Sequence, residues 1–240
     1  MTLAIHLYRR VMRRGRLIAL IALSSVPALP FWLSAYDAGP GEAEMLYGDI
    51  VARLGFSYAI AVLILTVAIL REERDAGTLP YIYMRPISRE SMAASSIIAG
   101  IGAALTLAIA GWLVTFTAAA AVGISMSTVT AGLVQLVAAG VGYAAVFVPL
   151  GYLVPRSILA GLAYIVVVEY ILAEVVTGLA QISLWRIALS ISADIADNPN
   201  PGDMLSAITP GVGGGIAKLA VVLILGFVCL TWALRKRDAL

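Results

Sequence analysis

One uncharged stretch constrains the fold more than any other feature of the chain. It runs from Ser91 to Pro155, 65 residues without Asp, Glu, Lys or Arg. A transmembrane helix needs about 20 apolar residues, so the stretch is too long for one span and about right for two. Residues 123–130, which are rich in Ser, Thr and Gly, are the natural turn between those two helices.

The composition of the whole chain is that of a membrane protein. Hydrophobic residues make up 61% of the 240 and charged residues 12%, whereas soluble domains carry about 45–50% and about 25%. Cys229 is the single cysteine and His6 the single histidine. This count excludes an internal disulfide, a cysteine-based metal site and any chemistry that needs two histidines.

Apolar segments predict an all-α integral membrane protein of one domain, residues 1–240, with six transmembrane helices. Pro27 and Pro30 are expected to kink the first span. The expected spans cover residues 17–36, 51–70, 92–122, 129–154, 157–180 and 216–234.

The N-terminal residues 2–16 predict a short amphipathic helix. Leu3, Leu7 and Val11 recur every four residues, and arginines occupy much of the remaining surface. Such a helix is expected to lie along the cytoplasmic face of the membrane, with its arginines among anionic headgroups.

The placement of lysine and arginine predicts the orientation of the chain. The outer side of a six-span chain holds only Arg53, Arg186 and Lys218. Both termini are therefore expected in the cytoplasm, in a protein of the plasma (inner) membrane. The thirteen basic residues on the inner side are Arg9, Arg10, Arg13, Arg14, Arg16, Arg71, Arg74, Arg85, Arg89, Arg156, Arg235, Lys236 and Arg237.

Three motifs for nucleotide binding or proteolysis are suggested by parts of the chain, but each lacks residues that its chemistry requires. The glycines of "GVGGGIAKLA" (211–220) suggest a phosphate loop, but that loop needs Gly-Lys-Ser/Thr and here Ala217 precedes Lys218. Glu72 and Glu73 form a pair like that of CAAX-type intramembrane proteases, which also need histidines on other helices. A rhomboid-type Ser/His dyad fails for the same lack of histidine. We expect no catalytic, cofactor-binding or metal-binding residue in this chain.

The cytoplasmic segment 71–91 predicts a short helix across the ends of the second and third spans. Residues 71–75 end the second span, Gly77 breaks the helix, and Thr78 can cap a new one. Pro80 falls within the first turn, where its missing N–H is tolerated.

The predicted short helix carries one apolar stripe, formed by Leu79, Ile82, Tyr83 and Pro86. Such a stripe suits insertion into a groove on a partner protein. Alternatively, the segment is an ordinary loop whose stripe rests on the membrane surface. After Arg85 and Pro86, either Ser88 or Ser91 can cap the third span.

The sequence "EERDAGTLPYIYMRPISRESMAASSIIAG" (72–100) resembles the signature of ABC-2 type transporter permeases. The shared pattern is a short acidic-basic run, Gly-Thr-Leu, a hydrophobic turn, Arg-Pro-Ile-Ser-Arg and a helix of small residues. Six spans, a basic N-terminal helix and a long outer segment (181–215) agree with that family along the whole chain. Pro80 and Met84 depart from it, because the family commonly has an acidic or polar residue and a serine there.

The resemblance implies a type V exporter-like permease whose segment 71–91 docks into an ATP-binding subunit as a coupling helix. It also implies a second permease chain in the same lipid bilayer, identical or closely related, and no nucleic acid partner. Two separate ATPase subunits would hold the ATP and Mg. The residues that it assigns to coupling are Glu72, Glu73, Asp75, Gly77, Thr78, Leu79, Ile82, Tyr83, Arg85, Pro86, Ser88 and Arg89.

Two acids, Glu169 and Glu174, lie within the predicted fifth span. An acid at mid-membrane costs about 2.5–3.5 kcal/mol, so a function is the default expectation. They are about 140° apart around a helix and cannot form one tight dyad. One could face a translocation path or the dimer interface; alternatively, both are structural, paired with Arg186 or with hydroxyls of neighbouring helices.

The outer segment 181–215 is too polar to span the membrane. Its residues 184–195 predict an amphipathic interfacial helix followed by a loop, whereas the resemblance implies short re-entrant helices.

The resemblance implies a membrane permease that separate ATPase subunits drive, for export of a substrate or for mechanical work on an extracytoplasmic partner. Two other functions stay open. One is a proton-coupled secondary transporter that uses Glu169 or Glu174, and the other is a non-transporting membrane anchor or immunity protein.

Overall fold

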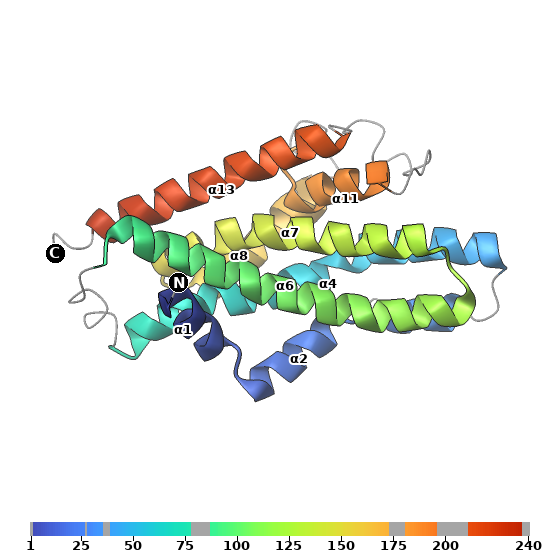
Figure 1. Cartoon of the computed structure of the whole chain (residues 1–240), viewed down its shortest axis with the longest axis horizontal. Coiled ribbons are helices and arrows are strands. Elements are labelled where there is room, and N and C mark those ends of the chain that lie inside the picture. The colour runs from blue at the N-terminus through green and yellow to red at the C-terminus, as the bar shows by residue number, and fades with distance from the viewer. Residues whose placement is uncertain are drawn as a thin grey trace.

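The described part of the protein is a bundle of helices without a strand. A computed structural model describes residues 2–26, 28–35, 39–77, 87–172, 181–195 and 211–236. Four long helices run side by side along the long axis of the molecule (Figure 1): α4 (Pro40–Asp75), α6 (Arg89–Val122), α7 (Met126–Leu153) and α13 (Gly211–Lys236).

Shorter helical segments surround these four. The carboxyl end of α13 and the amino end of α6 lie at the same end of the molecule, and α1 lies in the same half (Figure 1). The segments are α1 (Thr2–Val11), α2 (Arg14–Ser24), α3 (Ala28–Ala35), α8 (Ser157–Ala163), the π-helix η1 (Tyr164–Leu172) and α11 (Leu184–Ile195).

Within the described residues, five helical segments are long and apolar enough to cross a membrane. They are Gly15–Ala35, Gly55–Asp75, Arg89–Val122, Met126–Leu153 and Gly211–Lys236. The predicted fifth span begins with α8 and continues through η1 to Leu172, and its residues 173–180 lie outside the described residues. The multi-pass helical class is thus confirmed, whereas the count of six spans stays a prediction.

Several helix boundaries differ from the sequence-based expectation, two of them near the start of the chain. The N-terminal helix is not continuous over 2–16, because the backbone of Arg13 is extended and α2 begins at Arg14. The helix of the second predicted span, α4, begins at Pro40, well before the expected residue 51. Pro40 stands near the amino end and Glu42 in the first turn, both of which favour a helix start.

The apolar stripe of α1 faces the protein. Leu7 and Val11 are buried in the main core, and the Tyr8 hydroxyl lies 2.9 Å from the Thr106 hydroxyl of α6. Sequence periodicity predicted the stripe correctly, but the helical bundle covers it.

Small residues let the long helices approach closely. A Cβ atom added to Gly151 of α7 or to Gly226 of α13 would overlap backbone atoms of Val67 and Ala145, respectively. These helices therefore touch backbone to backbone, as is common where van der Waals packing holds membrane helices together.

The turns at the helix ends follow local sequence chemistry. Gly77 (φ 65°) follows α4 and Gly123 (φ 79°) follows α6, both with the left-handed backbone that glycine adopts without strain. The Ser88 side chain accepts a hydrogen bond from the Ser91 amide at 3.2 Å, so Ser88 is the N-cap of α6. This confirms one of the two predicted caps.

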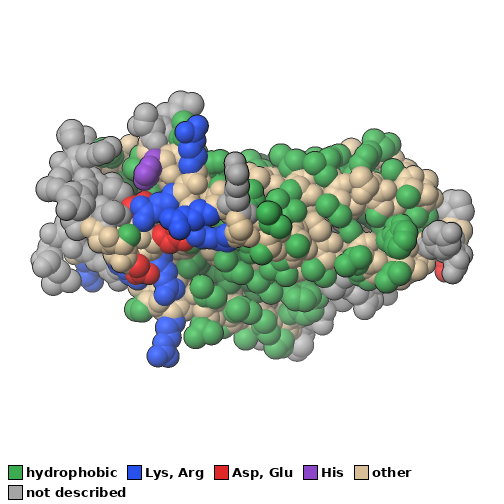
Figure 2. Space-filling model, turned by 90° about the horizontal axis from the view of Figure 1, so that it is seen from below, with side chains coloured by type: hydrophobic (Ala, Val, Ile, Leu, Met, Phe, Trp, Pro, Cys, Tyr) green, Lys and Arg blue, Asp and Glu red, His purple; other side chains and the backbone are tan. Residues whose placement is uncertain are grey.

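Basic side chains gather toward one end of the face that carries α1 and α2 (Figure 2). Lys and Arg side chains gather there in one band, and apolar side chains cover most of the remainder (Figure 2). Among those apolar side chains, Ile18 and Leu29 are largely exposed. Such a division is typical of a helical bundle that places one charged end at the membrane surface.

The close approach of α13 to α7 generates a test of the packing. Gly226→Ala should lower the free energy of unfolding by about 1–3 kcal/mol, because the added methyl group overlaps the carbonyl of Ala145. Gly213→Ala on the same helix is the matched control, since its Cβ would meet nothing within 4 Å. The midpoint of thermal unfolding in mild detergent measures both, and equal midpoints would contradict the packing.

Candidate functional site

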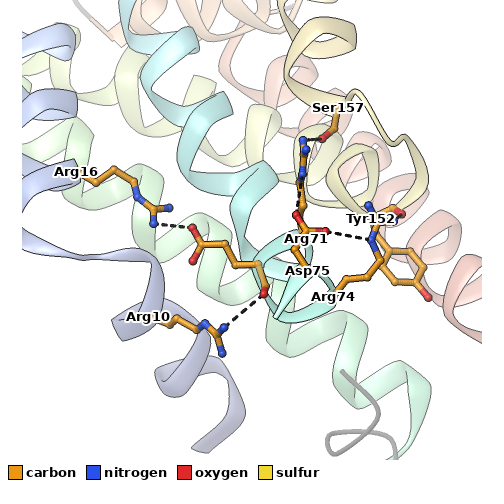
Figure 3. Close-up of polar contacts among 8 residues, drawn as sticks. Arg10, Arg16, Arg71, Arg74, Asp75, Tyr152 and Ser157 are labelled. Carbon is orange, nitrogen blue, oxygen red and sulfur yellow. Dashed lines mark hydrogen bonds and ion pairs between the residues drawn. The ribbon is translucent and has the colours of Figure 1, made fainter. Parts of the chain in front are cut away.

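The last turn of α4 carries five consecutive charged residues, Arg71 to Asp75, directly before the predicted coupling helix. We call these five residues the α4 end cluster. Their side chains point in different directions and meet residues from α1, α2, α7 and α8 (Figure 3).

Glu73 is the buried member of the α4 end cluster, with its side chain 1% exposed. The Arg10 guanidinium of α1 donates a hydrogen bond to its Oε1 at 2.7 Å. His6 Nε2 lies 3.6 Å from the same oxygen. A buried carboxylate needs such charged or hydrogen-bonding partners, and α1 supplies them to Glu73.

Glu72 faces the start of α2 and is more exposed. Its Oε1 forms an ion pair with Arg16 Nη2 at 2.5 Å. Arg10 reaches the backbone here too, donating from Nη2 to the Glu72 carbonyl at 3.4 Å (Figure 3). The N-terminal arginines thus contact two successive residues of the α4 end cluster.

On the opposite side, the α4 end cluster is tied to α7 and α8 (Figure 3). Arg71 donates to the Ser157 hydroxyl at 3.3 Å and to Asp75 Oδ2 at 3.4 Å. Arg74 donates to the Tyr152 carbonyl at 3.2 Å. A displacement of this turn would therefore be transmitted through these bonds to α1, α2, α7 and α8.

The remaining predicted coupling residues divide into two groups. Gly77, Ser88 and Arg89 are described and flank the segment at the ends of α4 and α6. Close by, Glu90 pairs with Arg235, which joins the amino end of α6 to the carboxyl end of α13. Thr78, Leu79, Ile82, Tyr83, Arg85 and Pro86 lie outside the described residues, so the docking helix stays a prediction.

Glu169 lies in η1 and is buried. Its carboxylate accepts hydrogen bonds from the Tyr164 hydroxyl at 3.0 Å and from the Leu184 and Trp185 amides at 2.9 and 3.2 Å. The Ser183 hydroxyl donates to its Oε2. Within the described residues, no basic side chain pairs with Glu169. Of the two partners expected for it, Arg186 or hydroxyls, the structure shows hydroxyls, and it adds two backbone amides.

Glu174, the second predicted acid, lies outside the described residues. The packing of α11 does differ from expectation. Leu184, Ile187 and Ile191 are buried in the main core, which a helix resting on the membrane surface would not show. The helix predicted over 184–195 is confirmed, but it is packed into the bundle.

Sequence reasoning missed the partners of the acids. Arg10 and Arg16 were assigned to headgroups, and nothing in the sequence pairs them with Glu73 and Glu72, more than fifty positions away. Ser183 carried a usable signal, because a serine directly before an apolar run is a typical N-cap. Its Oγ accepts from the Arg186 amide at 3.2 Å.

Comparison with known proteins bears directly on this arrangement. A family profile described as "ABC-2 family transporter protein" matches residues 12–177, more than half of the chain. The chain belongs to the ABC-2 transporter family. No curated protein and no solved structure matches it. As an ABC-2 permease it is a multi-pass membrane protein, and membership of this family implies association with ATP-binding cassette subunits.

The different burial of Glu73 and Glu72 predicts different effects of losing their arginines. In the permease, Arg10→Ala should lower the free energy of unfolding by about 3 kcal/mol, because the buried carboxylate of Glu73 loses its hydrogen-bonded ion pair. Arg16→Ala is the matched control and should cost less than about 1 kcal/mol, since Glu72 is 29% exposed.

Thermal unfolding in mild detergent at neutral pH measures both variants. Adding Glu73→Gln to Arg10→Ala should restore part of the loss, because the buried charge that has lost Arg10 is then removed. Equal effects of the two arginine variants would contradict the assigned burial.

Proposed function

We propose that this permease is the membrane-spanning subunit of an ATP-driven exporter, coupled to separate ATPase subunits through residues 71–91. The observation that supports this most is the α4 end cluster. This turn forms the start of residues 71–91 and is bonded to α1, α2, α7 and α8. A force applied to the segment would reach four other elements through these bonds.

The proposal assigns hydrolysis to the partner subunits. ATP and Mg bind there, and this chain contributes the docking surface and the spans. Two permease chains pair in the plasma membrane with their termini in the cytoplasm, as the basic residues favour. The work done on the outer side is export of a substrate or mechanical action on an extracytoplasmic partner.

The apolar stripe of the coupling segment gives the decisive test. Leu79→Asp combined with Tyr83→Asp should abolish co-purification with the ATPase, because two charges cannot enter an apolar groove without large desolvation. Ser127→Asp, at an exposed position near the start of α7, is the control and should leave association intact. Co-purification from native membranes in gentle detergent measures both variants.

Retention of the ATPase by the double variant would remove the basis for a docking helix at 79–86. A wild-type chain that purifies without any nucleotide-binding partner, even after crosslinking, would contradict the proposed function itself.

A further inference from the structure

The outer part of the fifth span, η1, packs against the bundle on one side, where Ile165 is buried in the main core. Inward contacts are made by the Tyr164 ring against Phe147, by Tyr170 against Phe56 of α4, and by Glu169. Its outward side carries the exposed apolar residues Val166, Val167 and Ile171. A π-helix is rare and lies frequently at a functional site, so this segment merits a functional explanation.

The amino end of α11 depends on Glu169. A helix start leaves its first amides without intrahelical partners. Leu184 and Trp185 donate to the two carboxylate oxygens of Glu169, and Arg186 donates to the hydroxyl of Ser183. The Ile187 amide then makes the first intrahelical bond, to the Ser183 carbonyl. Two of the three amides from Leu184 to Arg186 are therefore capped from another helix.

The body of α11 belongs to the central bundle. Leu184 packs against Gly142 of α7, Ile191 against Gly215 of α13, and the Trp185 ring fills the space over Gly55 of α4. Glycine at each of these positions allows close contact, which fixes α11 to three long helices. The contact between Glu169 and α11 is therefore the junction between that bundle and the fifth span.

The chemistry of this junction makes it reversible. One carboxylate is surrounded by neutral donors, so separating η1 from α11 breaks no ion pair. Separation does leave a charge and two amides without partners, which is tolerable only if water replaces them. The contact is thus stable while the outer side is dry and weakens when it is hydrated.

We propose that Glu169 is a positioning residue that latches the outer part of the fifth span to α11 and releases it when the outer mouth opens during the transport cycle. This inference rests on the proposed function, because it needs a cycle driven by the ATPase partner. It assigns the moving element to η1 and the fixed element to α11.

Glu169→Gln tests the contact in the purified permease. The glutamine side chain has the same shape but offers one oxygen, and its NH₂ group faces a backbone donor. Hydrogen exchange at the Leu184 and Trp185 amides should become at least about tenfold faster, because two charge-assisted bonds are weakened. Mass spectrometry of overlapping fragments measures this, with Glu90→Gln as the matched control.

Ser183→Ala provides a second variant if Glu169→Gln does not fold. It removes one donor to Glu169 and the acceptor of the Arg186 amide, so the Arg186 amide should exchange faster as well. Unchanged exchange at residues 184–186 in a folded variant would overturn the assigned contact.

A second measurement separates a latch from a static cap. In the complex with the ATPase, exchange at Leu184 and Trp185 should differ at least about tenfold between the nucleotide-free and ATP-bound states, and Glu169→Gln should abolish that difference. Equal exchange in both states of the wild type would overturn the latch while leaving the permease function intact. Absence of an ATPase partner would instead contradict the proposed function, and the Glu169→Gln comparison would still decide the contact.

Discussion

The requirement that every backbone amide find a partner without water governs this fold. Long helices meet it internally, which is why α4, α6, α7 and α13 dominate the molecule. A helix that begins inside the bundle cannot meet it alone, and α11 does so with Ser183 and with a carboxylate from η1. Placing an acid in apolar surroundings costs free energy. Here the acid also satisfies the first amides of α11, so the helix can start inside the bundle.

The fifth span is bonded to the bundle near both of its described ends. At its start, the Ser157 hydroxyl accepts a hydrogen bond from Arg71 of the α4 end cluster. Near its other described end, Glu169 accepts hydrogen bonds from the first amides of α11. Between them, apolar packing such as that of Gly161 against Leu63 joins it to α4. The charges of α4 and the acid of η1, which look unrelated in the sequence, therefore act on one span from opposite ends.

Sequence reasoning predicted what local patterns determine. The uncharged stretch 91–155 predicted α6 and α7, Gly77 and Ser88 marked the turn after α4 and the cap of α6, and 184–195 was recognised as a helix. The extension of α4 back to Pro40 was missed because its acids and Arg53 lower the hydropathy there. Periodicity identified the apolar stripe of α1 but not what covers it, and no pattern reveals that Glu169 meets Ser183. A π-helix also cannot be distinguished from an α-helix in an apolar run.

Close contact between α4 and α7 has a mechanical consequence. Val67 meets Gly151 backbone to backbone, so this point resists sliding and can serve as a fulcrum. From Val67 to Asp75 the input arm is about 12 Å long, and from Val67 back to Pro40 the output arm is about 40 Å, at 1.5 Å per residue. A rigid α4 pivoting there would turn a small displacement of the α4 end cluster into one about threefold larger, and in the opposite direction, at the Pro40 end of the helix.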